Sequence, residues 1–146
     1  MQKTLVLFKC DAIERGLVGA ILERFERAGL RIEDGRYLRP SLAEWQQHYA
    51  DLQSRNARAF ERSTQFFAGK PVFAMILAGP NAILKVRALV GPTDPLKAPA
   101  GTIRGDYSSD TVELADAEYR SALNLVHAAD SEATALREIA FWFKAG

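Results

Sequence analysis

Pro71–Gly79 reads PVFAMILAG and is the most continuous apolar run of the chain. Successive side chains of a strand point to opposite faces of its sheet, so a short run without polar residues is typical of a strand covered on both faces. The run therefore predicts a central strand. Residues 3–9 (KTLVLFK) predict a second buried strand that ends at Lys9, and residues 30–38 (LRIEDGRYL) predict a third with imperfect alternation.

Helical patterns lie between these runs. Apolar residues at positions 18, 21, 22 and 25 follow the i, i+3, i+4, i+7 spacing of a helix that runs from Leu17 to Ala28 and that Gly29 can end. Further helices are predicted from Pro40-Ser41 through Tyr49, over about residues 57–68, from a cap at Asn81 through Arg87, over residues 112–123, and from Asp130-Ser131 onwards with Leu136, Ile139, Ala140 and Phe143 as its buried face.

A short strand is predicted over residues 124–128, after a loop dense in Pro and Gly that spans residues 91–106. The resulting order is β, α, β, helices, β, α, long loop, helix, β, α. Strands and helices arranged as two β-α-β units predict an α+β fold, a ferredoxin-like α/β sandwich with helices packed on a four-stranded antiparallel sheet. We expect residues 1–146 to form a single domain.

Composition excludes several classes of protein. The chain has 146 residues and a formal charge of +1, from 19 Lys and Arg against 18 Asp and Glu, which disfavours a protein that coats nucleic acid or an anionic membrane. Cys10 is its only cysteine, so disulfides within the chain and a multi-cysteine zinc site are excluded, and a cytoplasmic setting is expected. The apolar run over residues 5–8 is too short for a signal-peptide core, and no apolar stretch of bilayer-spanning length occurs.

Candidate chemistry begins with the two histidines. His48 is interpreted as a surface or boundary residue of a helix, whereas for His127, at a strand end, a structural and a catalytic role are equally open. The long loop brings Thr93, Lys97, Thr102 and Arg104 together with Arg87 on the preceding helix, and these groups suit phosphate oxygens. Neither GxxxxGK[ST] nor GxGxxG occurs, so side chains would have to hold a nucleotide. RGD at residues 104–106 is expected to close a turn.

Six collinear strings resemble the nucleoside diphosphate kinase family. They are RGLVG at 15–19, HYADL at 48–52, GPTDP at 91–95, GTIRGD at 101–106, NLVHAADS at 124–131 and REIAFWF at 137–143. The resemblance implies a ferredoxin-like fold and a ping-pong reaction, in which the γ-phosphate of a nucleoside triphosphate such as ATP passes to a nucleoside diphosphate through a phosphohistidine. It also implies a homo-oligomer, hexamer or tetramer, built from dimers.

The resemblance assigns the phosphohistidine to His127. Glu138 matches the family carboxylate that accepts the imidazole Nε2–H and leaves Nδ1 free to attack. The residues that match substrate-contacting positions are Lys9, Tyr49, Arg55, Arg87, Thr93, Arg104 and Asn124.

Each matching position carries an expected role. The arginines Arg87 and Arg104 would hold phosphates with Thr93, and Mg²⁺ would be bound mainly through the nucleotide phosphates. Lys9 and Asn124 would hold the sugar 3′-hydroxyl, and the Tyr49 hydroxyl would lie near the γ-phosphate. Phe60 is the candidate that stacks on the base, with a core phenylalanine as the alternative. A base held mainly by stacking predicts broad base tolerance.

Three departures from the family pattern stand in the sequence. Cys10 replaces a proline, and Ala129 replaces a serine whose hydroxyl braces the family glutamate. The segment between Asp106 and Asn124 is longer than the short form of the family and predicts an inserted helix beside the active-site loop. An alternative is therefore a nucleotide-binding or regulatory relative with weakened catalysis, and a third is an interaction module that binds no ATP.

Overall fold

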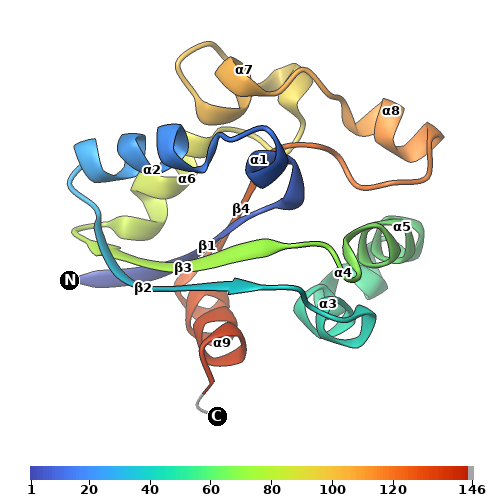
Figure 1. Ribbon diagram of the computed structural model, residues 1–146, viewed down its shortest axis with the longest axis horizontal. Helices are drawn as coiled ribbons and strands as arrows, with labels where there is room; N and C mark the ends of the chain where they lie inside the picture. The colour runs from blue at the N-terminus through green and yellow to red at the C-terminus, as the bar shows by residue number, and fades with distance from the viewer. Residues whose placement is uncertain (145–146) are drawn as a thin grey trace.

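The computed structural model describes residues 1–144 and contains one four-stranded sheet (Figure 1). Its strands are β1 (Gln2–Phe8), β2 (Arg31–Leu38), β3 (Val72–Gly79) and β4 (Val126–Ala128), in the spatial order β2-β3-β1-β4. All three strand pairs are antiparallel. The predicted α+β fold with an antiparallel four-stranded sheet is thus confirmed, and the apolar run that ends at Gly79 is one of the two central strands.

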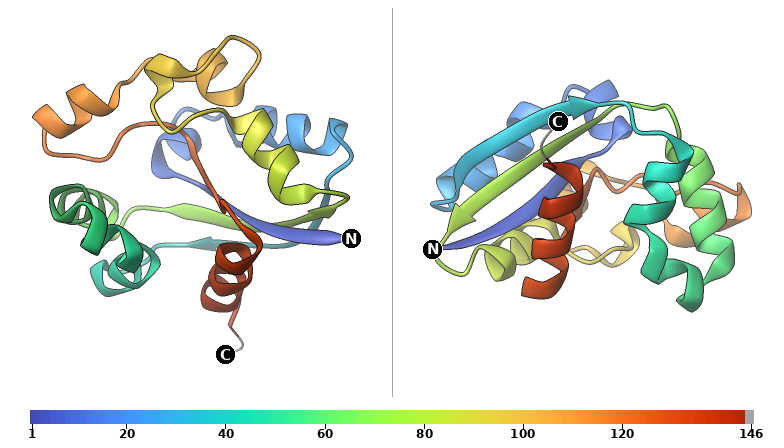
Figure 2. Two further views of the ribbon diagram at one scale, coloured as in Figure 1. Left: turned by 180° about the vertical axis from the view of Figure 1, so that it is seen from behind. Right: turned by 90° about the horizontal axis from the view of Figure 1, so that it is seen from below.

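Helices cover both faces of the sheet. Figure 2 shows α2 (Val18–Arg27) and α6 (Ala82–Val90) on one face and α9 (Glu132–Trp142) on the other. At one end of the sheet lie α3 (Leu42–His48), α4 (Ala50–Arg55) and α5 (Ala57–Phe67), as Figure 1 shows. The remaining helices are α1 (Cys10–Glu14), the 3-10 turn η1 (Pro95–Lys97), α7 (Ile103–Tyr107) and α8 (Val112–Ala117).

The alternation of β1 divides the core into two clusters. Val6 and Phe8 pack with α2 and α6, whereas Leu5 and Leu7 pack with aromatic residues of α3, α5 and α9. Because β4 pairs with β1, its Val126 and Ala128 join the first cluster. The residue between them, His127, therefore faces the side of the sheet that α9 covers.

Several helices differ from their predicted extents. The first strand is followed directly by the short helix α1, which apolar spacing did not predict, and the long loop contains η1 and α7. Arg104, Gly105 and Asp106 lie in α7, so the expected RGD turn is wrong. The helix predicted over residues 112–123 is the shorter α8. Asn81 occupies the position before α6 with φ 53°, but its side chain makes no cap hydrogen bond.

The last helix buries only part of the predicted face. Its buried residues are Ala135, Glu138 and Trp142, whereas Leu136 is 69% exposed and Ala140 is also exposed. Ile139 and Phe143, also predicted, are partly buried against the second cluster, so the expected face was wrong at Leu136 and Ala140, where it left out the side that contains Glu138. The predicted start is confirmed, since the Ser131 side chain accepts a hydrogen bond from the backbone N–H of Thr134 and caps α9.

Candidate functional site

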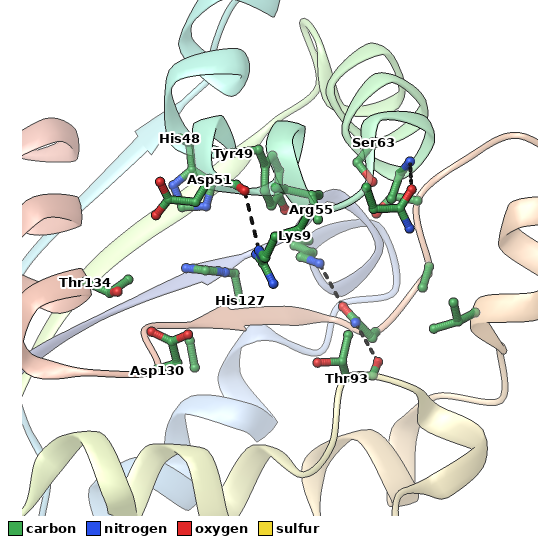
Figure 3. Close-up of a pocket in the computed structure, with 18 of the residues that line it drawn as sticks. Lys9, His48, Tyr49, Asp51, Arg55, Ser63, Thr93, His127, Asp130 and Thr134 are labelled. Carbon is green, nitrogen blue, oxygen red and sulfur yellow. Dashed lines mark hydrogen bonds between the residues drawn. The ribbon is translucent and has the colours of Figure 1, made fainter.

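A cavity of about 530 Å³ opens between α4 and α5 on one side and the loops around β4 on the other (Figure 3). Predicted site residues that line it are Lys9, Tyr49, Arg55, Arg87, Thr93, Arg104, Asn124, His127 and Glu138. Residues that the sequence did not single out also line it, namely Asp51, Leu52, Asn56, Ala59, Arg62, Ser63, Val112, Ser121, Ala122, Ala128, Asp130, Thr134 and Arg137, with His48. The fold thus gathers segments from the whole chain at one end of the sheet.

His127 and Glu138 form the innermost polar pair. Nε2 of His127 lies 2.9 Å from Oε1 and 3.0 Å from Oε2 of Glu138. The His127 side chain is 21% exposed and the Glu138 side chain 5%. Nδ1 of His127 makes no hydrogen bond within residues 1–144. The ring is therefore held from one nitrogen, and its other nitrogen is free to react.

The charge states of this pair follow from burial. Enclosure of the ring, together with the positive charges of Lys9 and Arg104, lowers the pKa of His127 to about 3. Burial raises the pKa of Glu138 to about 7. His127 is thus neutral at physiological pH, with the lone pair that a nucleophile needs.

His48 is part of the site, so its interpretation as a surface or boundary residue was wrong. It is buried, and its ring centroid lies 4.5 Å from that of His127. Its Nδ1 accepts a hydrogen bond of 3.0 Å from Nε1–H of Trp142 on α9. Burial lowers the pKa of His48 well below its usual range. Its spacing of three residues from the buried Trp45 was the sequence signal that His48 faces the core.

Arg104 is held rigidly at the base of the cavity. Its guanidinium donates to the carbonyls of Asn124, Gly91 and Val126 at 3.1, 3.0 and 2.6 Å. Burial, reinforced by the charge of Arg87, lowers the pKa of Arg104 to about 10. It remains a cation at neutral pH, and three carbonyls from two segments of the chain fix its direction.

Lys9 is held in the cavity by hydrogen bonds that run through Asn124 to Thr93. Its Nζ donates to Oδ1 of Asn124 at 2.8 Å, and Nδ2 of Asn124 donates to the carbonyl of Thr93 at 2.9 Å (Figure 3). Burial, together with the charge of Arg104, lowers the pKa of Lys9 to about 8. Arg87 completes the cationic wall with a hydrogen bond of 3.3 Å to the carbonyl of Ala128. Such convergent cations suit phosphate oxygens.

Three residues lie away from the cavity that they were expected to serve. Phe60 is buried and lines a separate cavity with residues of α3 and α4, so stacking of Phe60 on a base in the first cavity is wrong. Ala59 and Ser63, four residues apart on α5, face the first cavity instead, and Phe60 is turned away by one helical step. Lys97 is exposed, and Thr102 caps α7 by accepting from the N–H of Gly105.

One group of side chains has the spacing of a metal site. Within residues 1–144, ligand atoms of His48, His127 and Glu138 lie within 4.8 Å of one another. Mg²⁺ prefers an all-oxygen shell, so this nitrogen-rich group does not suit it. No helix within residues 1–144 has the length and apolar content to cross a membrane.

The family model for nucleoside diphosphate kinase matches residues 2–146. The chain belongs to the nucleoside diphosphate kinase family. It is 41% identical to the nucleoside diphosphate kinase of Pyrobaculum aerophilum over 99% of this chain and 96% of that protein, and 45% identical to that of Mycobacterium leprae over 97% and 96%. The solved structure of the Borrelia burgdorferi enzyme, a transition-state mimic with bound vanadate and ADP, has a TM-score of 0.94 at 37% identity, over 98% of this chain and 87% of that one.

The resemblance to nucleoside diphosphate kinases and the ferredoxin-like fold are thus confirmed. The chain is an enzyme of the phosphotransferase class, and its reaction is phosphoryl transfer between nucleotides. The roles of single residues in that reaction stay predictions.

Proposed function

We propose that His127 carries the phosphoryl group between donor and acceptor nucleotides. In the first half-reaction the Nδ1 lone pair attacks the γ-phosphorus of ATP, the bond to the β–γ bridging oxygen breaks, and ADP leaves. In the second half-reaction a terminal oxygen of another nucleoside diphosphate attacks the phosphohistidine and restores neutral Nδ1. The observation that carries this proposal is the hydrogen bond of Nε2 to Glu138, which leaves Nδ1 open to the cationic cavity.

Glu138 is proposed to stabilise the charge that the ring acquires. When Nδ1 bonds to phosphorus, the imidazole gains positive charge, and Nε2–H donates more strongly to the carboxylate. The low exposure of Glu138 keeps water from competing for that bond. Ala129 packs with Ile83 and Ala135, which are apolar, so in this chain the carboxylate relies on its hydrogen bond with His127. We expect transfer to proceed without the serine hydroxyl.

The cationic wall is proposed to hold and polarise the phosphates. Arg87 and Arg104 would offset the negative charge of the phosphoryl group in flight, with Thr93 as a further donor. Lys9 and Asn124 would bind the sugar 3′-hydroxyl, Tyr49 would donate its hydroxyl near the γ-phosphate, and Arg55 would contact the substrate from α4. Bound vanadate and ADP in the similar B. burgdorferi structure support a cavity of this kind for phosphoryl transfer.

Mg²⁺ is proposed to enter with the nucleotide. When bound, the ion neutralises charge on the β- and γ-phosphates. Among the charged side chains that line the cavity, cations outnumber carboxylates, and besides Glu138 the carboxylates are Asp51 and Asp130. These two could hold waters of the ion, so the donor set fits an ion held mainly by phosphate oxygens.

We further propose that residues 1–146 act as one cytoplasmic domain that assembles as a homo-oligomer, a hexamer or a tetramer. Residues from both ends of the described chain meet in the cavity, which supports one domain. Cys10 is buried as a free thiol, which suits a reducing compartment. The edge strand β2 exposes Tyr37 (52%) and Ile32 (39%), and exposed sheet edges favour association of copies. Light scattering after size-exclusion chromatography measures the assembly.

Incubation of the purified protein with γ-labelled ATP tests the proposed carrier. The expected product is a protein label that is labile to acid, stable to base, and lost when GDP is added. His127→Ala should remove the label and leave ADP affinity largely intact. A label that persists in this variant would exclude His127 as the carrier. Nucleotide binding without any label in the native protein would instead support the alternative, a catalytically weakened relative.

A further inference from the structure

Beyond the cationic wall formed by Lys9, Arg87 and Arg104, the cavity extends to a region lined by other residues, which we call its outer half. Figure 3 shows Ser63 at the end of the cavity away from Asp130 and Thr134. Apolar side chains line this half from two sides, Leu52 and Ala59 from α4 and α5, and Val112 and Ala122 from the inserted segment. The planar base of a nucleotide whose phosphates face His127 would fit between these sides.

The two sides are tied to each other. Arg62 on α5 donates to the main-chain carbonyl of Arg120, and Arg58 donates to Oδ1 and the carbonyl of Asp116 at 2.8 and 2.9 Å. Arg120 is itself paired with Asp110 at 2.7 Å. The inserted segment, residues 107–123, therefore forms one wall of the cavity and is held to α5 by these hydrogen bonds. The polar groups at the start of α5 and along it face this wall.

The polar groups of this outer half are mainly hydrogen-bond donors. Oδ1 of Asn56 accepts from the N–H of Ala59 at 3.0 Å, which leaves its amide N–H groups for a ligand. Arg62 contributes a buried guanidinium that donates to the carbonyl of Arg120 and whose Nε lies 3.4 Å from Oδ1 of Asp116. Ser63 is buried and adds a hydroxyl. The lining carboxylates are Asp51, Asp130 and Glu138, and all three belong to α4, α9 or the turn before α9.

We propose that Asn56, Arg62 and Ser63 select nucleobases with an exocyclic carbonyl over bases with an exocyclic amino group. This inference rests on the proposed function, which directs the phosphates to His127 and hence the far edge of the base to these residues. Guanine and hypoxanthine present O6 there, and uracil and thymine present O4. Adenine and cytosine present an amino group, which would face the Asn56 amide and the Arg62 guanidinium; Asp116, which pairs with Arg58 and Arg62, is not among the residues that line the cavity.

This proposal predicts a preference among nucleobases, in place of the broad base tolerance that stacking alone would give. Stacking alone does not distinguish bases, because every base has a π-face. Phe60 does not line this cavity and so does not supply a stacking contact there. A donor-lined edge instead distinguishes bases that differ by one exocyclic group. Arg62 and Asn56 are therefore specificity-determining residues in this proposal, and they take no part in the transfer of the phosphoryl group.

Titration calorimetry with matched nucleotides measures this selectivity without turnover. IDP and ADP differ at purine position 6, and UDP and CDP differ at pyrimidine position 4. We expect IDP to bind about fivefold more tightly than ADP, and UDP about fivefold more tightly than CDP, which is the effect of about one hydrogen bond. Equal affinities within both pairs would overturn the inference.

Asn56→Asp provides the decisive variant. An aspartate keeps the oxygen that caps α5 and replaces the amide donor with an acceptor, so the protein should fold and the IDP-to-ADP affinity ratio should fall about fivefold or reverse. Gln53→Glu introduces the same change of charge on α4 toward the separate cavity and should leave the ratio unchanged. An equal ratio in both variants would overturn the inference.

The phosphohistidine assay separates this inference from the proposed function. If the native protein is labelled by γ-labelled ATP but binds IDP and ADP, and UDP and CDP, with equal affinity, only this inference is refuted. A protein without label that still prefers IDP refutes only the carrier role of His127.

Discussion

Both carboxylate oxygens of Glu138 lie within hydrogen-bond distance of a single nitrogen of His127, at 2.9 and 3.0 Å from Nε2. A carboxylate in this position accepts the Nε2–H from either oxygen and thereby favours the tautomer with a lone pair on Nδ1. The tautomer of the His127 ring is thus determined by α9, the helix that covers this face of the sheet.

Glu138→Gln tests this relationship. The amide can donate to Nε2 and so favour the tautomer with its proton on Nδ1, which lacks the lone pair for attack. We expect the rate of phosphohistidine formation to fall about 100-fold, with ADP affinity changed little. Rapid quenching after mixing with γ-labelled ATP measures this rate. An unchanged rate would show that Glu138 does not control the tautomer.

The pH dependence of phosphohistidine formation should follow Glu138 and not His127. Burial raises the pKa of Glu138 to about 7, and enclosure lowers the pKa of His127 to about 3. As the pH falls through about 7, the carboxylate gains a proton and stops accepting the Nε2–H, so the rate should fall. Single-turnover rates between pH 5 and 9 measure this profile. A flat profile across that range would contradict the prediction, and Glu138→Gln should abolish the limb near pH 7.

Nucleotide binding should take up protons at mildly alkaline pH. Lys9 has a pKa lowered to about 8 by burial and by Arg104, so about half of its amines are neutral at pH 8. Phosphates favour the charged ammonium and raise this pKa, so ADP binding at pH 8 should consume up to about half a proton. Calorimetry in buffers of different ionisation enthalpy measures this uptake. Lys9→Met is the control, and equal uptake in both proteins would assign the proton elsewhere.

Trp142→Phe should destabilise the protein. The substitution removes the Nε1–H that His48 Nδ1 accepts at 3.0 Å and leaves a buried acceptor unpaired. We expect the free energy of unfolding to fall by about 2 kcal/mol. Leu136→Ala on the same helix is the matched control, since Leu136 is 69% exposed and its loss should change stability by no more than about 0.5 kcal/mol. Urea unfolding of the two variants compares them, and equal losses would contradict the importance of the Trp142–His48 contact.

The sequence predicted the sheet because its strands carry strong local signals. The run that ends at Gly79 is apolar at almost every position, and β1 also places apolar residues on both faces, so both central strands could be recognised without tertiary information. Helix α2 was equally clear, since its buried Ile21 and Phe25 follow one stripe. The collinear motifs then identified the family.

The sequence predictions were wrong where polar residues of the cavity are buried, because an apolar pattern counts such residues as exposed. The buried face of α9 holds Glu138, a residue type that periodicity counts as solvent-facing, so the predicted stripe was displaced to Leu136. His48 was missed for the same reason. Phe60 was assigned by its place near the expected base site, but only the rotation of α5 decides which side chains reach the cavity, and Ala59 and Ser63 do.

Arg104 donates to the carbonyls of Gly91, Asn124 and Val126, and these bonds to its own chain fix the direction of the guanidinium. The guanidinium is therefore oriented for phosphate oxygens without rearrangement, both for the nucleotide that donates a phosphoryl group and for the one that accepts it. In the proposed reaction, this one geometry serves both the transfer of the phosphoryl group to His127 and its transfer away from His127. The direction of net flow is then decided by the relative abundance of the nucleotides outside, which makes the protein a reversible exchanger and not a one-way pump of phosphate.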